Sequence, residues 1–188
     1  MAIPRVRGKS RNDIEKISRS DLEYFDPECL ASPKALCVWQ VFDMLDDFGI
    51  ETGVINGLGA EGMCFSNDGV ITIFVDSYTY DGCCEDIPRD RFTIMHEIFH
   101  ALHHQRYLLD SSVTSTVMYR RSELKAYEDP EWQANSYASA ILMPAKPTLE
   151  VINNSTPFTA TDNVMETFIV SRSAAEKRIE NLRKMDLI

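Results

Sequence analysis

The chain has 188 residues, of which 44% are hydrophobic and 26% are charged, close to the averages of globular domains. This composition supplies a core and excludes collagen-like, low-complexity and wholly disordered classes. The formal net charge is −10, which disfavours direct nucleic-acid binding because phosphate contacts depend on Lys and Arg.

The charge is unevenly distributed along the chain. Residues 1–20 hold six basic and two acidic side chains, and residues 171–188 hold five basic and three acidic ones. The residues between them therefore carry a net charge of −16. We expect an acidic body with two basic ends, and residues 1–20 are predicted to form a flexible basic arm.

Cysteine usage and hydropathy predict the compartment. The five cysteines are an odd number without regular spacing, whereas a disulfide framework usually has an even number. No apolar stretch resembles a signal peptide, and no run approaches the ~20 apolar residues of a membrane span. We therefore expect a cytoplasmic protein with no membrane partner.

The hydrophobic pattern predicts helices around one short group of strands. A helix is expected from the cap Ser32-Pro33 to the stop at Gly49, followed by strands separated by the hairpin turn Asn67-Asp68-Gly69. The other expected elements, in chain order, are strands at 52–55, 62–66 and 70–75, a loop at 77–87, a helix at 88–109, a loop with a short strand at 110–127, a helix at 130–143, and shorter helices ending near 153 and at 161–168 and 171–184.

All four histidines lie between positions 96 and 104. His96 and His100 are one helical turn apart, about 6 Å along the axis and on one face. That spacing lets two imidazoles bind one Zn²⁺, and Glu97 beside them is able to take a proton from a metal-bound water. The sequence His96-Glu97-x-x-His100 is the metallopeptidase motif, in which spacing assigns the roles.

The third ligand is expected from a second helix. A metzincin site would need Gly and His where the chain has His103 and Arg106, so that variant fails. On the helix at 130–143, Glu131 and Asn135 interrupt an otherwise small and apolar stripe. A metal and its histidine are a physical reason to pack these groups there. Glu128, which precedes the helix, is the competing ligand.

These motifs resemble the ImmA/IrrE family of zinc metallopeptidases over roughly residues 30–185. The resemblance implies an α+β, zincin-like fold of the gluzincin type, with a small antiparallel or mixed sheet. It implies His96, His100 and Glu131 as zinc ligands, Glu97 as the catalytic residue and Asn135 as the partner of a ligand histidine. The matching segments are Arg91 to His100, Glu131-x-x-Ala134-Asn135-x-Tyr137-Ala138, Ile141 to Pro144, and Phe168 to Leu182.

The resemblance also implies a domain organisation and a substrate class. We expect a peptidase core at 21–150 and a C-terminal helical segment at 151–188 packed on it. The implied substrate is a helix-turn-helix repressor whose cleavage switches on mobile-element or stress genes. Two departures from the usual family pattern are Phe99, which replaces a Gly and is expected to narrow the cleft, and Gln133, which stands where a second acid is common.

Other interpretations stay open at the level of sequence. The strand at 70–75 is either a sheet edge that pairs with extended substrate or an ordinary core strand. His103, His104 and Tyr119 are either oxyanion donors or packing residues, with packing favoured. Cys83 and Cys84 are either a loop or a second metal or redox site, but their acidic neighbours disfavour a reactive thiol.

Two functions other than peptidase are also open. A non-catalytic zinc-fold protein would bind and sequester a repressor, but it would not need the general base Glu97. A DNA-binding regulator would use residues 161–184 as a helix-turn-helix, but that segment has only a slight basic excess. The peptidase hypothesis is favoured over both.

Overall fold

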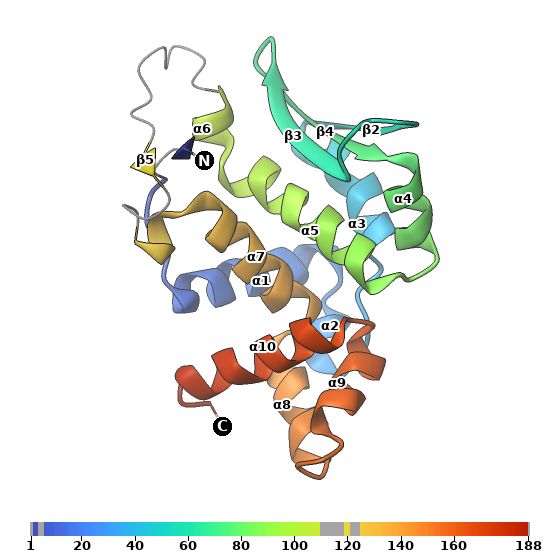
Figure 1. The fold of residues 1–188 in the computed structure, drawn as a ribbon, viewed down its shortest axis with the longest axis vertical. Coiled ribbons are helices and arrows are strands. Elements are labelled where there is room, and N and C mark those ends of the chain that lie inside the picture. The colour runs from blue at the N-terminus through green and yellow to red at the C-terminus, as the bar shows by residue number, and fades with distance from the viewer. Residues whose placement is uncertain (1, 4–5, 110–118, 121–124, 188) are drawn as a thin grey trace.

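Helix α5 lies between a small mixed sheet and a larger helical layer and packs against both (Figure 1). The computed structural model describes residues 2–3, 6–109, 119–120 and 125–187. The α+β class predicted from the sequence is confirmed. Among the described residues, no helix is long and apolar enough to cross a membrane.

The N-terminal segment contains a helix, α1 (Arg11–Phe25), where a flexible arm is predicted. Ser10 and Asp13 form a capping box, in which each side chain accepts the other's backbone N–H. Ile14 and Leu22 are buried at 2% and 0% exposure. The expectation for residues 11–20 is therefore wrong, because a basic surface concealed an amphipathic face.

The next helical region is shorter than predicted. After α2 (Glu28–Ala31), α3 (Val38–Asp43) begins well beyond Pro33 and continues as a 3-10 helix (Met44–Phe48). The predicted stop is present, because Gly49 has a φ of +69°, in the left-handed region that favours glycine.

The sheet consists of β2 (Ile50–Ile55), β3 (Gly62–Asn67) and β4 (Val70–Asp76) in the order β2-β4-β3. Strand β4 pairs in parallel with β2 and antiparallel with β3. At the predicted hairpin turn, Asp68 and Gly69 both have positive φ. Because β4 is the central strand, the hypothesis that residues 70–75 form a free edge is wrong. Strand β3 is the edge that lies against α5.

Residues 77–87, predicted to be a loop, contain α4 (Ser77–Cys84), which the Asp76 side chain caps. Helix α5 (Pro88–His103) follows and continues after a break as α6 (Gln105–Leu109). On the other side of α5 lies α7 (Pro130–Leu142), which also packs on α1. A short pair, β1 (Ala2–Ile3) with β5 (Tyr119–Arg120), and a 3-10 helix (Ala126–Glu128) precede α7.

The C-terminal helices lie below α1 and α7 in Figure 1. They are α8 (Ala145–Asn153), α9 (Ala160–Phe168) and α10 (Arg172–Lys184). Arg178 of α10 is 2% exposed. It donates to the Met143 carbonyl at 2.8 Å and to Glu15 of α1 at 3.0 Å. A buried guanidinium paired in this way connects the C-terminal segment to the rest of the fold.

Candidate metal centre

Helix α5 presents His96, Glu97 and His100 on its partly exposed side. The opposite side is apolar, and residues such as Ile94 and Ile98 are fully buried. Residues four apart lie one turn apart on a helix. The two imidazole rings consequently face the same space, with centroids 4.9 Å apart.

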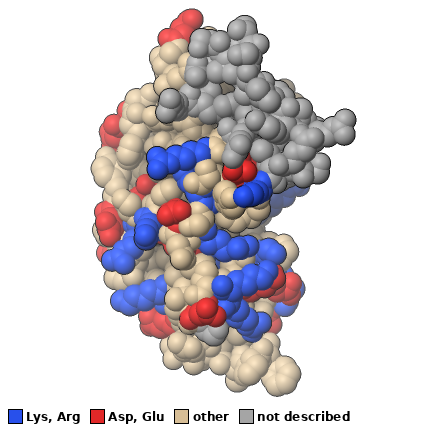
Figure 2. Space-filling model, turned by 90° about the vertical axis from the view of Figure 1, so that its left-hand side faces the viewer, with Lys and Arg blue, Asp and Glu red and all other residues tan. Residues whose placement is uncertain are grey.

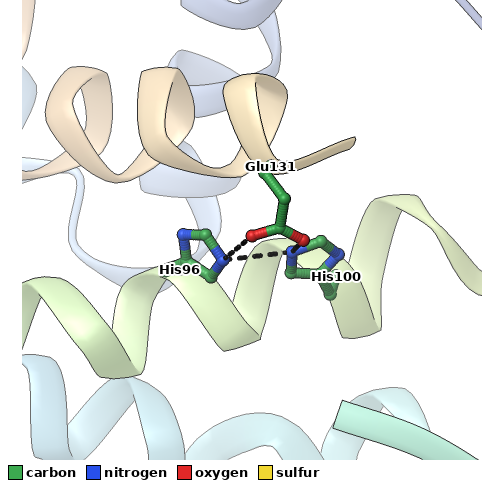
Figure 3. A group of neighbouring side chains, drawn as sticks. All are labelled: His96, His100 and Glu131. Carbon is green, nitrogen blue, oxygen red and sulfur yellow. Dashed lines mark hydrogen bonds and ion pairs between the residues drawn. The ribbon is translucent and has the colours of Figure 1, made fainter. Parts of the chain in front are cut away.

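Helix α7 brings Glu131 to this space from its first turn (Figure 3). The Asp129 carboxylate caps the helix by accepting the Glu131 backbone N–H at 2.9 Å. Pro130 occupies the first helical position. Further along, Ala134 and Ala138 are fully buried, and such small side chains allow α7 to approach α5 closely.

The donor atoms of the three side chains form a compact triangle. His96 Nε2 lies 3.2 Å from Glu131 Oε2 and 3.2 Å from His100 Nε2, and His100 Nε2 lies 3.5 Å from Glu131 Oε1. Tetrahedral ligands at ~2.0–2.1 Å from zinc would stand about 3.3 Å apart. The residues therefore fit one zinc ion, and within the described ranges they form a group able to hold a metal. Their role as ligands stays a prediction.

Glu97 lies against the edge strand β3. A Cβ on Gly62 would stand only 3.0 Å from Glu97 Cγ, so the strand backbone packs closely on this side chain. Burial raises the pKa of Glu97 and the charge of Glu131 adds to this, while His96 and the Cys64 backbone N–H oppose it. A carboxylate whose pKa is raised towards neutrality is a more effective general base.

The pKa values of His96 and His100 are shifted in opposite directions by their surroundings. Burial lowers the pKa of His96, but its hydrogen bond to Glu131 and the charges of Glu97 and Glu131 outweigh burial and raise it. For His100, burial followed by the charge of His96 lowers the pKa to about 4. Metal binding requires neutral imidazoles, so the surroundings of His100 favour the metal-binding form and those of His96 oppose it.

Asn135 lies where a partner of a ligand histidine is expected. Its Oδ1 is 3.2 Å from His96 Nδ1, so an N–H on Nδ1 would leave Nε2 free to bind a metal. Glu131 and Asn135 contact the candidate ligand histidines, as expected, although neither is fully buried. The Glu131 side chain is 43% exposed and Asn135 is exposed, because both lie at the edge of the buried stripe.

A buried hydrogen-bond chain extends from the other histidine, and the sequence did not reveal it. His100 Nδ1 lies 3.0 Å from His104 Nδ1, and His104 Nε2 lies 3.0 Å from Gln133 Oε1. His104 and Gln133 are 3% and 0% exposed. Burial lowers the pKa of His104 to about 3, so this imidazole is neutral.

The donors and acceptors of this hydrogen-bond chain allow only one set of proton positions. Gln133 Nε2 donates to the carbonyls of Arg7 and Tyr127 at 3.0 and 2.7 Å, which can only accept. Its Oε1 therefore accepts from Lys9 Nζ at 2.9 Å and from His104 Nε2. The Nδ1 of neutral His104 must then accept from His100 Nδ1, which leaves His100 Nε2 with a lone pair for a metal.

His103, His104 and Phe99 do not belong to the donor triangle. His103 Nε2 is 2.7 Å from Asp21 Oδ2, which also accepts from Tyr137. His104 is buried, as the packing interpretation expects, and the side chain of Tyr119 lies outside what the structure describes. Phe99 is fully buried against Tyr137, with ring centroids 4.8 Å apart. The expectation that Phe99 narrows a cleft is therefore wrong.

The competing sites do not form metal-binding groups in the described part of the chain. Glu128 ends the short 3-10 helix before α7 and does not belong to the donor triangle. Cys83 is buried and Cys84 is exposed at the end of α4. Burial raises the pKa of Cys83 to about 12, so this thiol stays protonated and unreactive at neutral pH.

Comparison with known proteins gives one family match. Residues 84–180 match the peptidase family model described as the IrrE N-terminal-like domain. The matched span is slightly more than half of the chain, and it contains the three candidate ligands, Glu97 and Asn135. A search of the curated proteins finds no match.

Proposed function

This chain belongs to the ImmA/IrrE family of metallopeptidases, and from that premise we propose that it is a zinc-dependent endopeptidase that cleaves a helix-turn-helix repressor. The observation that carries the proposal is the donor triangle of His96, His100 and Glu131, with sides of 3.2, 3.2 and 3.5 Å. Glu97 lies beside this triangle, on the same helix as His96 and His100.

The residues have distinct roles in the proposed reaction. His96, His100 and Glu131 would hold the zinc ion, which when bound lowers the pKa of water and polarises the scissile carbonyl. Glu97 accepts the proton of the attacking water and passes it to the leaving amine. Its raised pKa favours both transfers, because the carboxyl group must act first as a base and then as an acid.

The edge strand β3 supports an extended substrate. The sheet order leaves one side of β3 without a strand partner among the described residues, and Gly62 brings this strand against Glu97. An extended peptide added to a free edge gains main-chain hydrogen bonds. We place this interaction at β3 instead of the strand at 70–75, which is paired on both sides.

The charges favour a protein substrate over DNA. The segment proposed to read DNA corresponds to α9 and α10, whose exposed cations are largely paired. Lys177 and Lys184 both contact Glu180, and Arg172 contacts Asp162. Figure 2 shows a face where Lys and Arg are interspersed with acids. The net charge of −10 would attract a partner that is itself basic, as DNA-binding proteins are on the surface that meets DNA.

The test is cleavage of a candidate helix-turn-helix repressor by the purified, zinc-loaded protein. We expect cleavage by the wild type and by the control Glu150→Gln on the surface of α8, and a loss of at least about 10²-fold in Glu97→Gln, which keeps its zinc. Equal activity in Glu97→Gln would contradict the peptidase mechanism. Cleavage of casein but not of the repressor would contradict only the substrate class.

A further inference from the structure

A cavity of about 420 Å³ adjoins the candidate metal centre. It lies between the start of α1, the first turns of α5, and the facing sides of α7 and α10. Its size falls within the range of small-ligand pockets. Much of its wall is apolar, and its apolar lining residues include Phe92, Trp132, Val170 and Ala174.

The cavity and the metal centre share a wall. Asn135 lines the cavity, and its Oδ1 lies 3.2 Å from His96 Nδ1. Thr93 also lines the cavity and precedes Glu97 by one helical turn on α5. Residues of an extended peptide are spaced by ~3.3 Å. A peptide whose scissile bond lies at the triangle would therefore bring a side chain one or two residues away to this cavity.

The charges around the cavity are of one sign. Its lining includes Arg11, Arg89 and Lys177 but no Asp or Glu, although the chain as a whole is strongly acidic. Arg11 stacks over Trp132, 5.6 Å from the ring centroid, and no acid of the described residues is paired with it. Arg89 and Lys177 pair with Glu61 and Glu180, which leaves Arg11 as the lining cation available to a ligand.

We propose that this cavity is the specificity pocket of the peptidase. It takes a large apolar side chain next to the scissile bond, and Arg11 binds an acidic residue that flanks this side chain. The proposal rests on the proposed function and specifies its cleavage sequence. It separates two charge effects: the acidic body attracts a basic partner, but the segment that enters the active site is apolar and acidic.

Binding is measured first, without catalysis. The chain has two tryptophans, so Trp39→Phe leaves Trp132 as the only one and its emission reports on the cavity. The probes are capped peptides that contain Asp-Leu, or Lys-Leu and Asp-Gly as controls. We expect a saturable emission change with Asp-Leu and binding at least about 10-fold weaker with each control. No change with Asp-Leu, or equal affinity for all three, would overturn the proposal.

Two pairs of variants then test specificity in cleavage of a peptide library. Ala174→Phe fills the cavity, and Ala145→Phe adds the same ring at another half-buried helical alanine. Arg11→Glu reverses a charge of the lining, and Arg19→Glu reverses one on the exposed side of the same helix. We expect Ala174→Phe to lose about 10–200-fold in kcat/KM for large apolar residues, and Arg11→Glu to lose the acidic preference. Both should retain zinc, and the controls should match the wild type.

The outcomes separate the two proposals. Binding at Trp132 without any cleavage would support the pocket and contradict the peptidase. Cleavage with a sequence preference that Ala174→Phe leaves unchanged would support the peptidase and overturn the pocket.

Discussion

The two histidines of the candidate centre are held in opposite ways. His100 is hydrogen-bonded to His104, which begins a buried hydrogen-bond chain through Gln133 to Lys9 in the N-terminal segment. His96 has one side-chain partner behind it, the exposed Asn135, and beyond Asn135 lies the cavity. The centre therefore has a fixed inner side, at His100, and an adaptable outer side, at His96. A hydrolytic site that must also receive a peptide needs both.

Of the two supports, the inner one should have the larger effect on zinc affinity when it is removed. His104→Leu deletes the acceptor that fixes the His100 tautomer and leaves the buried Gln133 Oε1 with one donor fewer. We expect zinc affinity to fall about 10–100-fold, as measured by competition with a chromophoric chelator. The matched control is His103→Leu at the neighbouring position, because the His103 side chain pairs with Asp21 instead. Equal losses in both variants would show that His104 acts only through packing.

Removing the outer support should have a smaller effect. Asn135 is exposed, and water can replace its hydrogen bond to His96. Asn135→Ala should weaken zinc binding by only about 2–10-fold, the range of a single hydrogen bond, in the same competition assay. A loss as large as that of His104→Leu would contradict the contrast between the two sides.

The inner side should also make stability depend on pH. Burial lowers the pKa of His104 to about 3 from an ordinary 6.5, so in acid the unfolded chain binds a proton that the folded chain excludes. The contribution of His104 to the free energy of unfolding is complete above pH ~6.5. It falls as the pH drops towards the pKa of the folded state, by up to about 1.4 kcal/mol per pH unit. Urea unfolding of the zinc-free protein between pH 7 and 4.5 measures this slope, which His104→Leu should make shallower. An unchanged slope would indicate that His104 is protonated in the fold.

The two helical motifs of the centre were predictable from sequence, but the hydrogen-bond chain behind His100 was not. Helical spacing places His96, Glu97 and His100 together on α5, and Glu131 and Asn135 together on α7. The chain behind His100 joins Gln133 to Lys9 and to the Arg7 carbonyl, more than 120 residues away in sequence. No local period encodes such a contact. The one available signal was His104 itself, which continues the stripe of His96 and His100 at intervals of four.

The helices of the fold were likewise predictable only in part. Periodicity predicted α5, α7, α9 and α10 close to their observed bounds, because each buries one clear apolar face. It missed α4, where a composition rich in Tyr, Gly, Cys and acids, with Gly82 among them, predicted a loop. That glycine makes room for a residue of α5, since a Cβ on it would overlap the Asp90 side chain as it is placed. It also missed α1, where charge concealed the capping box of Ser10 and Asp13.

The ligand set is the central claim, and zinc affinity in Glu131→Ala tests it most directly. Glu128→Ala is the control, because Glu128 precedes the same helix but lies outside the donor triangle. We expect one zinc per chain in the wild type and in Glu128→Ala, and a strongly reduced affinity in Glu131→Ala with the fold intact by circular dichroism. Wild-type affinity in Glu131→Ala, or a loss of zinc in Glu128→Ala instead, would contradict the assignment.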